Sequence, residues 1–389
     1  MAQTPTAVMQ GIEVPTSSID PANFFRLTRR LSIPFKTGAY GGLGQTDTTQ
    51  LLQTGIVSGV TIKASGTLTV TPGTGTVATT SKWPYGLAKN VRFSANGQSN
   101  LINCSGIHLK LREIMQRGDL TDRGVTNNIG GAHPGTARNQ GTLALASEAW
   151  GVGQNVTAVP AGSYAVELEW YLPVAFDDLN LLGAVFAQTS ATDLVVAVDW
   201  ANTPDLFTLT GNATVSLSMS TVYEATLYTI PQGPNGSVIV PDLSAFHSII
   251  QTRYGTPTNG MNEIRLAGQG VGKQLLRLWW TTYNNNVPLA LNATNYGQVG
   301  WRYGGNDTPE IYPDGKLMAY RAEKLFNSDF GSYAGAGCFD FCSENAFRDS
   351  VDQGTATELR LMLELPNALA LTSPYVEYVA ETVSAGASA

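Results

Sequence analysis

The chain has 389 residues, a net charge of −7 and only 14% charged residues, against about 25% in an average soluble domain. This length predicts about two domains, with cores large enough to need neither disulfide nor metal staples. The acidic balance argues against a general phosphate-binding surface, which requires clustered Lys and Arg, so we expect no direct contact with nucleic acid. The 41 Gly and abundant small polar residues favour broad lateral packing between subunits.

The N-terminal region is polar and punctuated by proline, which predicts an arm over residues 1–24 with a short helix near Pro21–Phe25. It lacks the charged start and apolar block of a secretory signal, so we expect the protein to be made and kept in a cytoplasm. No acidic residue occurs from Pro21 to Thr46, whereas four basic residues do. This stretch is either a solvated first strand or an inner-face segment that contacts anionic lipid headgroups. The candidate membrane-facing residues are Arg26, Arg29, Arg30 and Lys36.

Alternation of apolar and polar residues dominates the rest of the chain and predicts β-strands. Such strands have one buried and one wetter face, which is typical of antiparallel sheets packed as a sandwich. Asn-Gly and Asp-Gly pairs supply turns between them. The alternating runs are Val166–Leu172, Leu194–Trp200, Val215–Thr221, Leu276–Trp280, Leu359–Leu365 and Tyr375–Val379.

Few segments have helical periodicity. Ser105 is a suitable N-cap for the first predicted helix, and Asp177 and Asp178 stand at the start of the second, where acids suit the helix dipole. The predicted helices are Gly106–Arg117, Leu179–Gln188 and Lys316–Phe326.

Two passages 208 residues apart match one another, beginning at Val91 and at Val299. Each predicts a strand, a turn and a helix in the same order, which indicates a duplicated domain; chance similarity between two β-rich stretches is the alternative. Two prolines and two glycines near residues 231–236 mark the boundary. We therefore predict domains over residues 25–231 and 232–384, followed by a flexible tail over residues 385–389.

Residues that could carry catalysis or bind a metal are scattered. His108, His133 and His247 have no partner at ligand spacing, so no metal site is predicted. Three cysteines make no disulfide framework, and Cys338 and Cys342 are expected to be buried thiols on one strand face. No nucleophile elbow, phosphate-binding loop or dinucleotide fingerprint occurs, so we predict no cofactor and no catalytic residue.

One pair of carboxylates leaves an enzymatic alternative open. Glu167 and Glu169 share a strand face, and a jelly-roll glycosidase needs two carboxyl groups facing each other across a sugar. Outward charges on a solvated sheet explain the same pair. A second alternative is a carbohydrate- or receptor-binding β-sandwich of a spike, in which aromatic residues would stack sugars, although core or subunit-contact positions suit them better. The candidates are Trp279, Trp280, Trp301 and Tyr303.

Residues 165–202 resemble the major capsid protein of tectivirus-type, membrane-containing icosahedral phages. The resemblance lies in a strand ending at Leu172-Pro173-Val174-Ala175-Phe176, the segment led by Asp177 and Asp178, and a return strand closing on Trp200-Ala201-Asn202. It implies an all-β chain of two eight-stranded jelly rolls side by side, a double jelly roll with a few short helices and an N-terminal arm. It also implies a structural role in the virion, with no catalysis.

The resemblance further implies the partners. Homotrimers with a pseudo-hexagonal outline would tile an icosahedral shell against neighbouring trimers, with vertex (penton) and minor capsid proteins completing it. The arm would face an internal viral membrane, and assembly would take place in the host cytoplasm. Long loops would form outer turrets; the candidates are Gly118–Gly162, Tyr254–Gly272 and Asn284–Tyr296.

Overall fold

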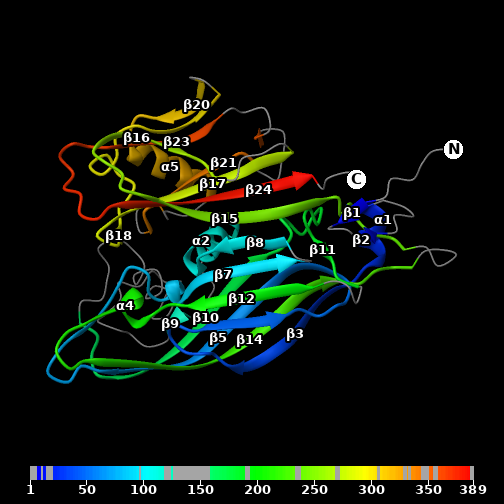
Figure 1. Cartoon of the computed structure of the whole chain (residues 1–389), viewed down its shortest axis with the longest axis horizontal. Helices are drawn as coiled ribbons and strands as arrows, with labels where there is room; N and C mark the ends of the chain where they lie inside the picture. Colours follow the sequence, from blue (N-terminus) through cyan, green and yellow to red (C-terminus); the bar gives the residue numbers. More distant parts are fainter. Residues whose placement is uncertain are drawn as a thin grey trace.

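Two similar blocks of strands lie side by side in the computed structural model of the chain (Figure 1). It describes residues 7–9, 12–14, 21–95, 98–117, 124–125, 158–188, 193–232, 238–267, 272–304, 307–326, 331, 334–342, 350–353 and 358–385. His133, the Asn96-Gly97 turn and most of the predicted turret segment Gly118–Gly162 lie outside these residues.

The first block consists of two facing sheets. One sheet has the order β3 (Arg30–Ala39), β14 (Thr214–Tyr228), β5 (Ile56–Thr71), β10 (Gly162–Pro173) and β9 (Gly124–Val125), with β11 (Val185–Phe186) also paired to β5. The facing strands run in the order β4 (Thr46–Gln50), β12 (Leu194–Trp200), β7 (Ala88–Ala95) and β8 (Gln98–Cys104).

The second block repeats this arrangement. Its first sheet has β15 (Ala245–Gly255), β24 (Tyr375–Ala385) and β17 (Lys273–Asn284), and β17 also pairs with β18 (Val287–Pro288), β21 (Ala336–Asp340) and β22 (Val351–Asp352). The facing sheet has β16 (Gly260–Arg265), β23 (Leu359–Leu365), β19 (Val299–Tyr303) and β20 (Asp307–Tyr312). The order β3-β14-β5-β10 thus corresponds to β15-β24-β17-β21, and β4-β12-β7-β8 to β16-β23-β19-β20. This is the predicted pair of eight-stranded jelly rolls.

The duplicated passages noted in the sequence occupy equivalent places. β7 and β8 form a hairpin that leads into α2 (Gly106–Arg117), and β19 and β20 form a hairpin that leads into α5 (Gly315–Phe326). Both helices have 12 residues. Ser105 Oγ accepts a hydrogen bond from the backbone N–H of His108 at 3.3 Å, as predicted, and Asp314 Oδ1 caps α5 through the N–H of Leu317 at 2.8 Å.

The remaining elements are short. The helix predicted near Pro21–Phe25 is α1 (Pro21–Leu27). The others are α4 (Thr203–Leu206), the 3-10 helix η1 (Tyr85–Leu87), and two small hairpins, β1 (Ala7–Met9) with β2 (Ile12–Val14), and β6 (Val77–Thr79) with β13 (Phe207–Leu209). Among the described residues, no helix is long and apolar enough to cross a bilayer.

The helix predicted over Leu179–Gln188 is wrong. The segment turns and then forms the two-residue strand β11. Asp177 Oδ1 accepts from the N–H groups of Leu179 and Asn180 at 3.0 and 2.8 Å, which holds a local turn in place of a first helical turn. Gly183 then adopts φ +82°, where a Cβ would lie 2.6 Å from the backbone nitrogen of His247. Only glycine allows this close approach, which a helix could not make.

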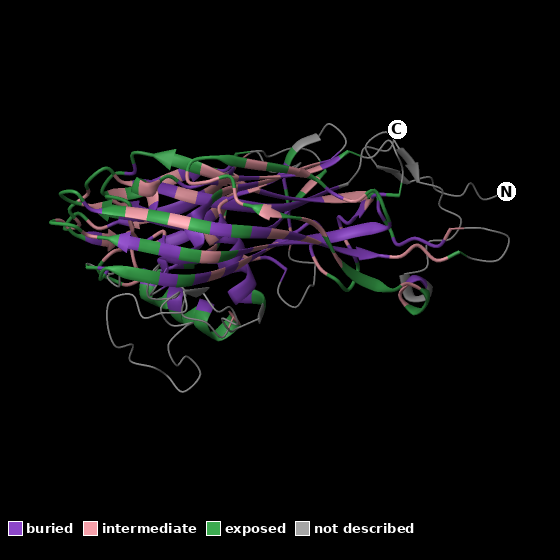
Figure 2. Ribbon diagram, turned by 90° about the horizontal axis from the view of Figure 1, so that it is seen from below, coloured by how far each residue is buried: buried purple, intermediate pink, exposed green. Residues whose placement is uncertain are grey.

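The strand alternation seen in the sequence separates core from surface (Figure 2). In β10, Val166, Leu168 and Trp170 are buried, while Glu167 and Glu169 point to the opposite face. One apolar core is centred on first-roll residues such as Trp170 and Trp200 and extends across the junction to Trp279 of the second roll. A second core, with residues such as Trp280 and Leu361, lies within the second roll. β14 ends at Tyr228 and β15 begins at Ala245, and the domain limits themselves stay a prediction.

The two rolls are joined by strand pairing. β8 of the first roll pairs in parallel with β15 of the second, through Ile102 with Ile249 and Asn103 with Ile250, so that one sheet of ten strands runs through both rolls. β24, the last strand, ends toward the α1 side of this body, whereas β18 lies at the opposite end (Figure 1). The predicted turret segments Tyr254–Gly272 and Asn284–Tyr296 contain β16 and β18, respectively.

Candidate functional site

The two rolls meet on α2. This helix contacts β7, β10 and η1 of its own roll, and its other side faces β17 and β24 of the second roll. Polar side chains are buried along with apolar ones, which is unusual for an amphipathic helix because its polar face ordinarily lies in water. The second roll covers the side of α2 that carries His108 and Arg112, whereas Lys110 pairs with Glu113 at 2.9 Å and lies 5.2 Å from the centre of the Tyr85 ring of its own roll. The buried side chains of α2 are His108, Leu109, Lys110, Leu111, Arg112, Glu113, Ile114 and Met115.

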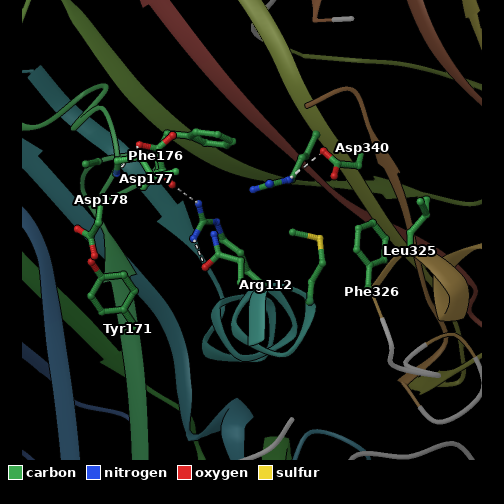
Figure 3. Close-up of a pocket in the computed structure, with 13 residues that line it drawn as sticks. Arg112, Tyr171, Phe176, Asp177, Asp178, Leu325, Phe326 and Asp340 are labelled. Carbon is green, nitrogen blue, oxygen red and sulfur yellow. Dashed lines mark hydrogen bonds and ion pairs between the residues drawn. The ribbon is translucent and has the colours of Figure 1, made fainter. Parts of the chain in front are cut away.

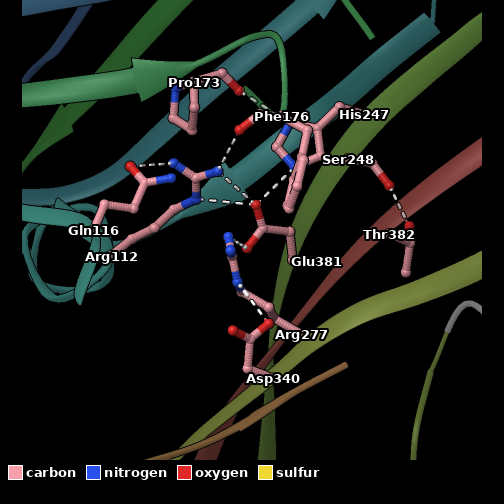
Figure 4. Close-up of polar contacts among 10 residues, drawn as sticks. All are labelled: Arg112, Gln116, Pro173, Phe176, His247, Ser248, Arg277, Asp340, Glu381 and Thr382. Atoms are coloured by element: carbon pink, nitrogen blue, oxygen red, sulfur yellow. Dashed lines mark hydrogen bonds and ion pairs between the residues drawn. The ribbon is translucent and has the colours of Figure 1, made fainter. Parts of the chain in front are cut away.

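A network of ion pairs centred on Glu381 fastens this junction (Figure 4). Glu381 of β24 is fully buried, and its Oε1 accepts from Arg112 Nε at 2.9 Å, from Arg112 Nη2 at 2.8 Å and from His247 Nε2 at 2.9 Å. Arg277 Nη1 lies 3.5 Å from Oε2, and its Nε donates to Asp340 at 3.1 Å. The network therefore ties α2 to four strands of the second roll, β15, β24, β17 and, through Asp340, β21.

The same network holds the turn after β10. Arg112 Nη2 donates to the backbone carbonyl of Phe176 at 3.1 Å, and His247 Nδ1 lies 3.1 Å from the carbonyl oxygen of Pro173. The guanidinium of Arg277 lies 4.7 Å from the centre of the Phe176 ring. The first-roll backbone and second-roll side chains are thus interlocked.

The electrostatics favour a permanently charged Glu381. Burial alone would raise the pKa of this carboxyl group, but the guanidinium groups of Arg112 and Arg277 outweigh burial and hold the pKa well below its usual range. Two arginines and two carboxylates, Glu381 and Asp340, balance one another. Removing one member of such a buried set leaves an uncompensated charge, which costs roughly 3–5 kcal/mol.

His108 makes a different contact at the junction. Its ring packs edge-on against Trp279 of β17, with ring centres 5.5 Å apart. Burial lowers the pKa of His108 to about 3, the strongest opposing influence being the charge of Glu381. The imidazole is therefore neutral at pH 7 and acts as part of the apolar packing.

A cavity of about 460 Å³ opens beside the network (Figure 3). Its walls come from both rolls and include Arg112, Arg277 and Phe176. Three carboxylates, Asp177, Asp178 and Asp340, also line it. The guanidinium groups of Arg112 and Arg277 already bind Glu381 and Asp340. The charged residues that line the cavity therefore stabilise the joint between the rolls.

The carboxylates of the glycosidase alternative lie elsewhere. Glu167 and Glu169 are partly exposed on the outer face of β10. Lys63 Nζ of the neighbouring strand lies 4.0 Å from Glu169 and 3.1 Å from Glu224. Neither Glu167 nor Glu169 lines the cavity described above. Glu167 and Glu169 are therefore surface carboxylates on the outer face of a sheet.

The remaining candidate residues are structural in the described part of the chain. Cys104, Cys338 and Cys342 are buried thiols, as expected for Cys338 and Cys342. β21 ends at Asp340, however, so Cys342 lies beyond the strand and packs in a different apolar cluster from Cys338. No group of three or more His, Cys, Asp or Glu residues suited to a metal occurs among the described residues. Trp279, Trp280 and Trp301 are core residues.

The structure groups three of the four candidate membrane-facing residues. Arg26, Arg29 and Arg30 are exposed at the α1 end, where Arg30 Nη2 lies 3.2 Å from Asp178. Lys36 lies six residues further along β3, about 20 Å from Arg30 at the usual rise of a strand. Its ammonium sits 5.3 Å from the Tyr223 ring centre and donates to the Thr48 carbonyl oxygen at 3.3 Å.

Two jelly rolls of equal strand order, interlocked side by side, define the double jelly-roll fold of viral major capsid proteins. The chain matches the crystal structure of the major capsid protein of Sulfolobus Turreted Icosahedral Virus at 15% identity with a TM-score of 0.63, over 92% of this chain and 97% of that one. It matches a chain of the PBCV-1 virus capsid at 11% identity and a TM-score of 0.56, over 92% and 95% of the two chains. These neighbours are capsid proteins and not enzymes. No family model matches the sequence, and no curated protein matches it.

Sequence reasoning missed the junction. The predicted strand Tyr375–Val379 ends before Glu381, and the predicted helix Gly106–Arg117 assigns no partner to Arg112. One signal was present: Glu377 and Glu381 stand four apart within an apolar strand, hence on one face. Carboxylates inside an otherwise apolar strand point to buried partners.

Proposed function

We propose that this chain is a structural major capsid protein located in the virion capsid, assembled in the host cytoplasm, and that its function is to supply a rigid shape. The observation that carries the proposal is the joint: two rolls of the same topology share one ten-stranded sheet and are fixed by buried charges around Glu381. A carrier of a single binding or catalytic site has no need of such a duplicated rigid body. A shell tile does, because every tile must present the same sides to its neighbours.

We propose that three chains form the tile. Two rolls per chain give six rolls in a trimer and hence a pseudo-hexagonal outline, which neighbouring trimers can pack against. Vertex (penton) and minor capsid proteins would complete the shell. Light scattering of the purified protein tests this: the proposal expects a mass three times the 41.4 kDa of one chain. A protein that stays monomeric at all concentrations would contradict it.

We propose that residues 1–24 include the membrane-facing arm, residues 25–231 and 232–384 the two rolls, and residues 385–389 a tail. Phe24 is fully buried and its ring centre lies 6.3 Å from that of Tyr228. A truncation designed to remove the arm alone should therefore stop at residue 20.

The α1 end supports contact with an internal membrane. Arg26, Arg29 and Arg30 are exposed there, next to Leu27 and Leu31, which are 52% and 37% exposed. Basic residues beside exposed apolar ones suit a surface of anionic headgroups, where each Lys or Arg contributes about 1 kcal/mol. The sequence from Pro21 to Thr46 contains no acid, and Asp178, which lies 3.2 Å from Arg30 Nη2, pairs with one of the three arginines at this end.

Vesicle flotation tests the membrane contact. The intact protein should float with vesicles containing an anionic lipid and less so with neutral vesicles or at high salt. Replacing Arg26, Arg29 and Arg30 by Gln should weaken flotation, whereas Lys89→Gln and Arg265→Gln, exposed elsewhere, should not. Equal flotation of both variants would show that these three arginines do not form the contact.

A further inference from the structure

The duplicated helices α2 and α5 have different surroundings. Both begin at a glycine that follows a capping side chain, so aligning Ser105 with Asp314 pairs the helices position by position. α2 is buried between two rolls, whereas α5 of the second roll has an outer face in solvent. The four positions of α2 that face the second roll or its cavity are His108, Leu111, Arg112 and Met115. Their equivalents on α5 are Leu317, Tyr320, Arg321 and Lys324.

These equivalents form an exposed face that mixes apolar and basic groups. Leu317 is 44% exposed and Tyr320 is 53% exposed, although both are large hydrophobic residues. Arg321 is exposed and only loosely paired, with Nη2 3.6 Å from Glu310, and Lys324 lies over the Tyr320 ring at 5.1 Å. Lys316 adds a third cation, against one exposed acid, Glu323. The position that makes the buried ion pair in α2 is thus occupied by arginine in α5 as well.

The surface that would match this face is also present on the chain. α2 docks on the outer face of the β24-β17 sheet, which carries Glu381. The equivalent outer face of the first roll, on β14, β5 and β10, carries Glu224, Glu169 and Glu167, with Lys63 lying 3.1 Å from Glu224 and 4.0 Å from Glu169. It is acidic where α5 is basic, and its carboxylates are partly exposed.

The strand edges of the two rolls also correspond to one another, as the two helices do. β8 pairs with β15 inside the chain, and their equivalents are β20 and β3. Both β20 and β3 are terminal strands of their sheets within the described residues. By the hairpin registers, Ile102 and Asn103, which pair with β15, correspond to Glu310 and Ile311. Ile311 is 42% exposed. Unpaired edges bearing apolar residues are templates for another chain.

We propose that the α5–β20 face of the second roll docks on the β3-β14-β5-β10 face of the first roll of a second copy of this chain, and so repeats between chains the joint that α2 makes within one. This rests on the proposed function and specifies its subunit interface. Arg321 takes the part of Arg112, and the carboxylates Glu169 and Glu224 receive the basic helix. Because the two faces differ, the contact is head-to-tail and closes into a ring when the rotation permits.

The test reverses charges on each face of the full-length protein and measures mass by light scattering. The variant Arg321→Glu/Lys324→Glu should fall to the 41.4 kDa of a single chain. This monomer should still unfold in one cooperative thermal transition, which shows that the reversals leave the fold intact. Glu167→Lys/Glu169→Lys should do the same. A chain carrying all four changes should regain the wild-type mass, because both faces are reversed together. A charge-matched control, Lys89→Glu/Arg265→Glu, should retain the assembly.

The outcomes separate the two proposals. A wild-type protein that is itself monomeric contradicts the trimeric capsid role. A wild-type assembly that survives the α5 reversals, or that is lost equally in the control, overturns the interface while leaving the capsid role standing. Failure of the four-change chain to reassemble, when both double variants are folded monomers, also counts against direct pairing of these two faces.

Discussion

Arg112 and Glu381 stand 269 residues apart in the sequence and meet in a 2.8 Å ion pair that water does not reach, with 3% and 0% of their side chains exposed. One belongs to the helix of the first roll and the other to the last strand of the second. The chain's two halves are therefore coupled by the kind of contact that tolerates little change in geometry. A shell tile made of two domains needs this stiffness.

Removing the guanidinium tests that coupling. Arg112→Met keeps much of the side chain's length but leaves Glu381 buried with fewer partners, so we expect a loss of roughly 3–5 kcal/mol in the free energy of unfolding. Urea denaturation followed by tryptophan fluorescence measures it. The matched control is Lys89→Met, which breaks the exposed 2.9 Å pair with Asp205 and should cost at most about 1 kcal/mol. Equal losses in the two variants would mean that the junction is not fastened by charge.

Lowering the pH should reduce the free energy of unfolding, because His108 takes up a proton more readily in the unfolded state. Its folded pKa of about 3 lies below the ordinary value of 6.5, so the unfolded state binds the proton more readily between these values. The stability contribution is full above pH 6.5 and is lost as the pH falls, by about 1.4 kcal/mol per pH unit. Between pH 6.5 and pH 5 this is about 2 kcal/mol.

The variant His108→Leu isolates that contribution, because leucine is the residue at the equivalent position of α5. We expect it to flatten the fall in stability between pH 6.5 and pH 5, and to cost less than about 1.5 kcal/mol at pH 8, where the wild-type ring is neutral in both states. Denaturant titrations at a series of pH values provide the measurement. An unchanged pH slope would assign the acid sensitivity to other groups.

The glycines that open the two helices should be intolerant of a side chain. A Cβ on Gly106 would lie 2.6 Å from both Trp170 Nε1 and the Tyr85 carbonyl oxygen, and one on Gly315 would lie 2.9 Å from the Asn292 carbonyl oxygen. Ala at either position should cost about 1–3 kcal/mol through overpacking. Gly38→Ala, in β3 with nothing within 4 Å of a Cβ, is the control and should be neutral or better. Thermal unfolding distinguishes these expectations.

Catalysis by Glu167 and Glu169 is testable in a simple assay. We expect no hydrolysis of a panel of glycosides by the wild-type protein, and none by Glu167→Gln/Glu169→Gln, because the pair lies on an outer sheet face beside Lys63. Hydrolysis by the wild type that disappears in the variant would restore the enzymatic alternative.

Local patterns in the sequence predicted what depends on local physics. Period-two alternation located β10, β12 and β23 because one face of each strand is buried, and Ser105 located the start of α2 because a cap is a local contact. The duplication was visible as two hairpins followed by helices. The segment after Asp177 was misread because carboxylates can cap an isolated turn as well as a helix, and Gly183 decides the matter by its contact with a distant strand.

The junction depends on contacts that no local pattern contains. α2 has the apolar stripe of a surface helix, and the burial of Arg112 follows only from placing the second roll on top of it. Likewise, the exposed side chains of Leu317 and Tyr320 indicate a docking face only when they are compared with His108 and Leu111, their equivalents on α2. Pairing between segments so far apart is set by the fold as a whole.

A cryo-electron microscopy map of the purified assembly tests the central claim most directly. The account predicts particles of three chains with six barrels in a ring, two from each chain, and α2 enclosed between the barrels of one chain. A map with a single sandwich per chain, or with two barrels that move independently about the junction, would contradict it.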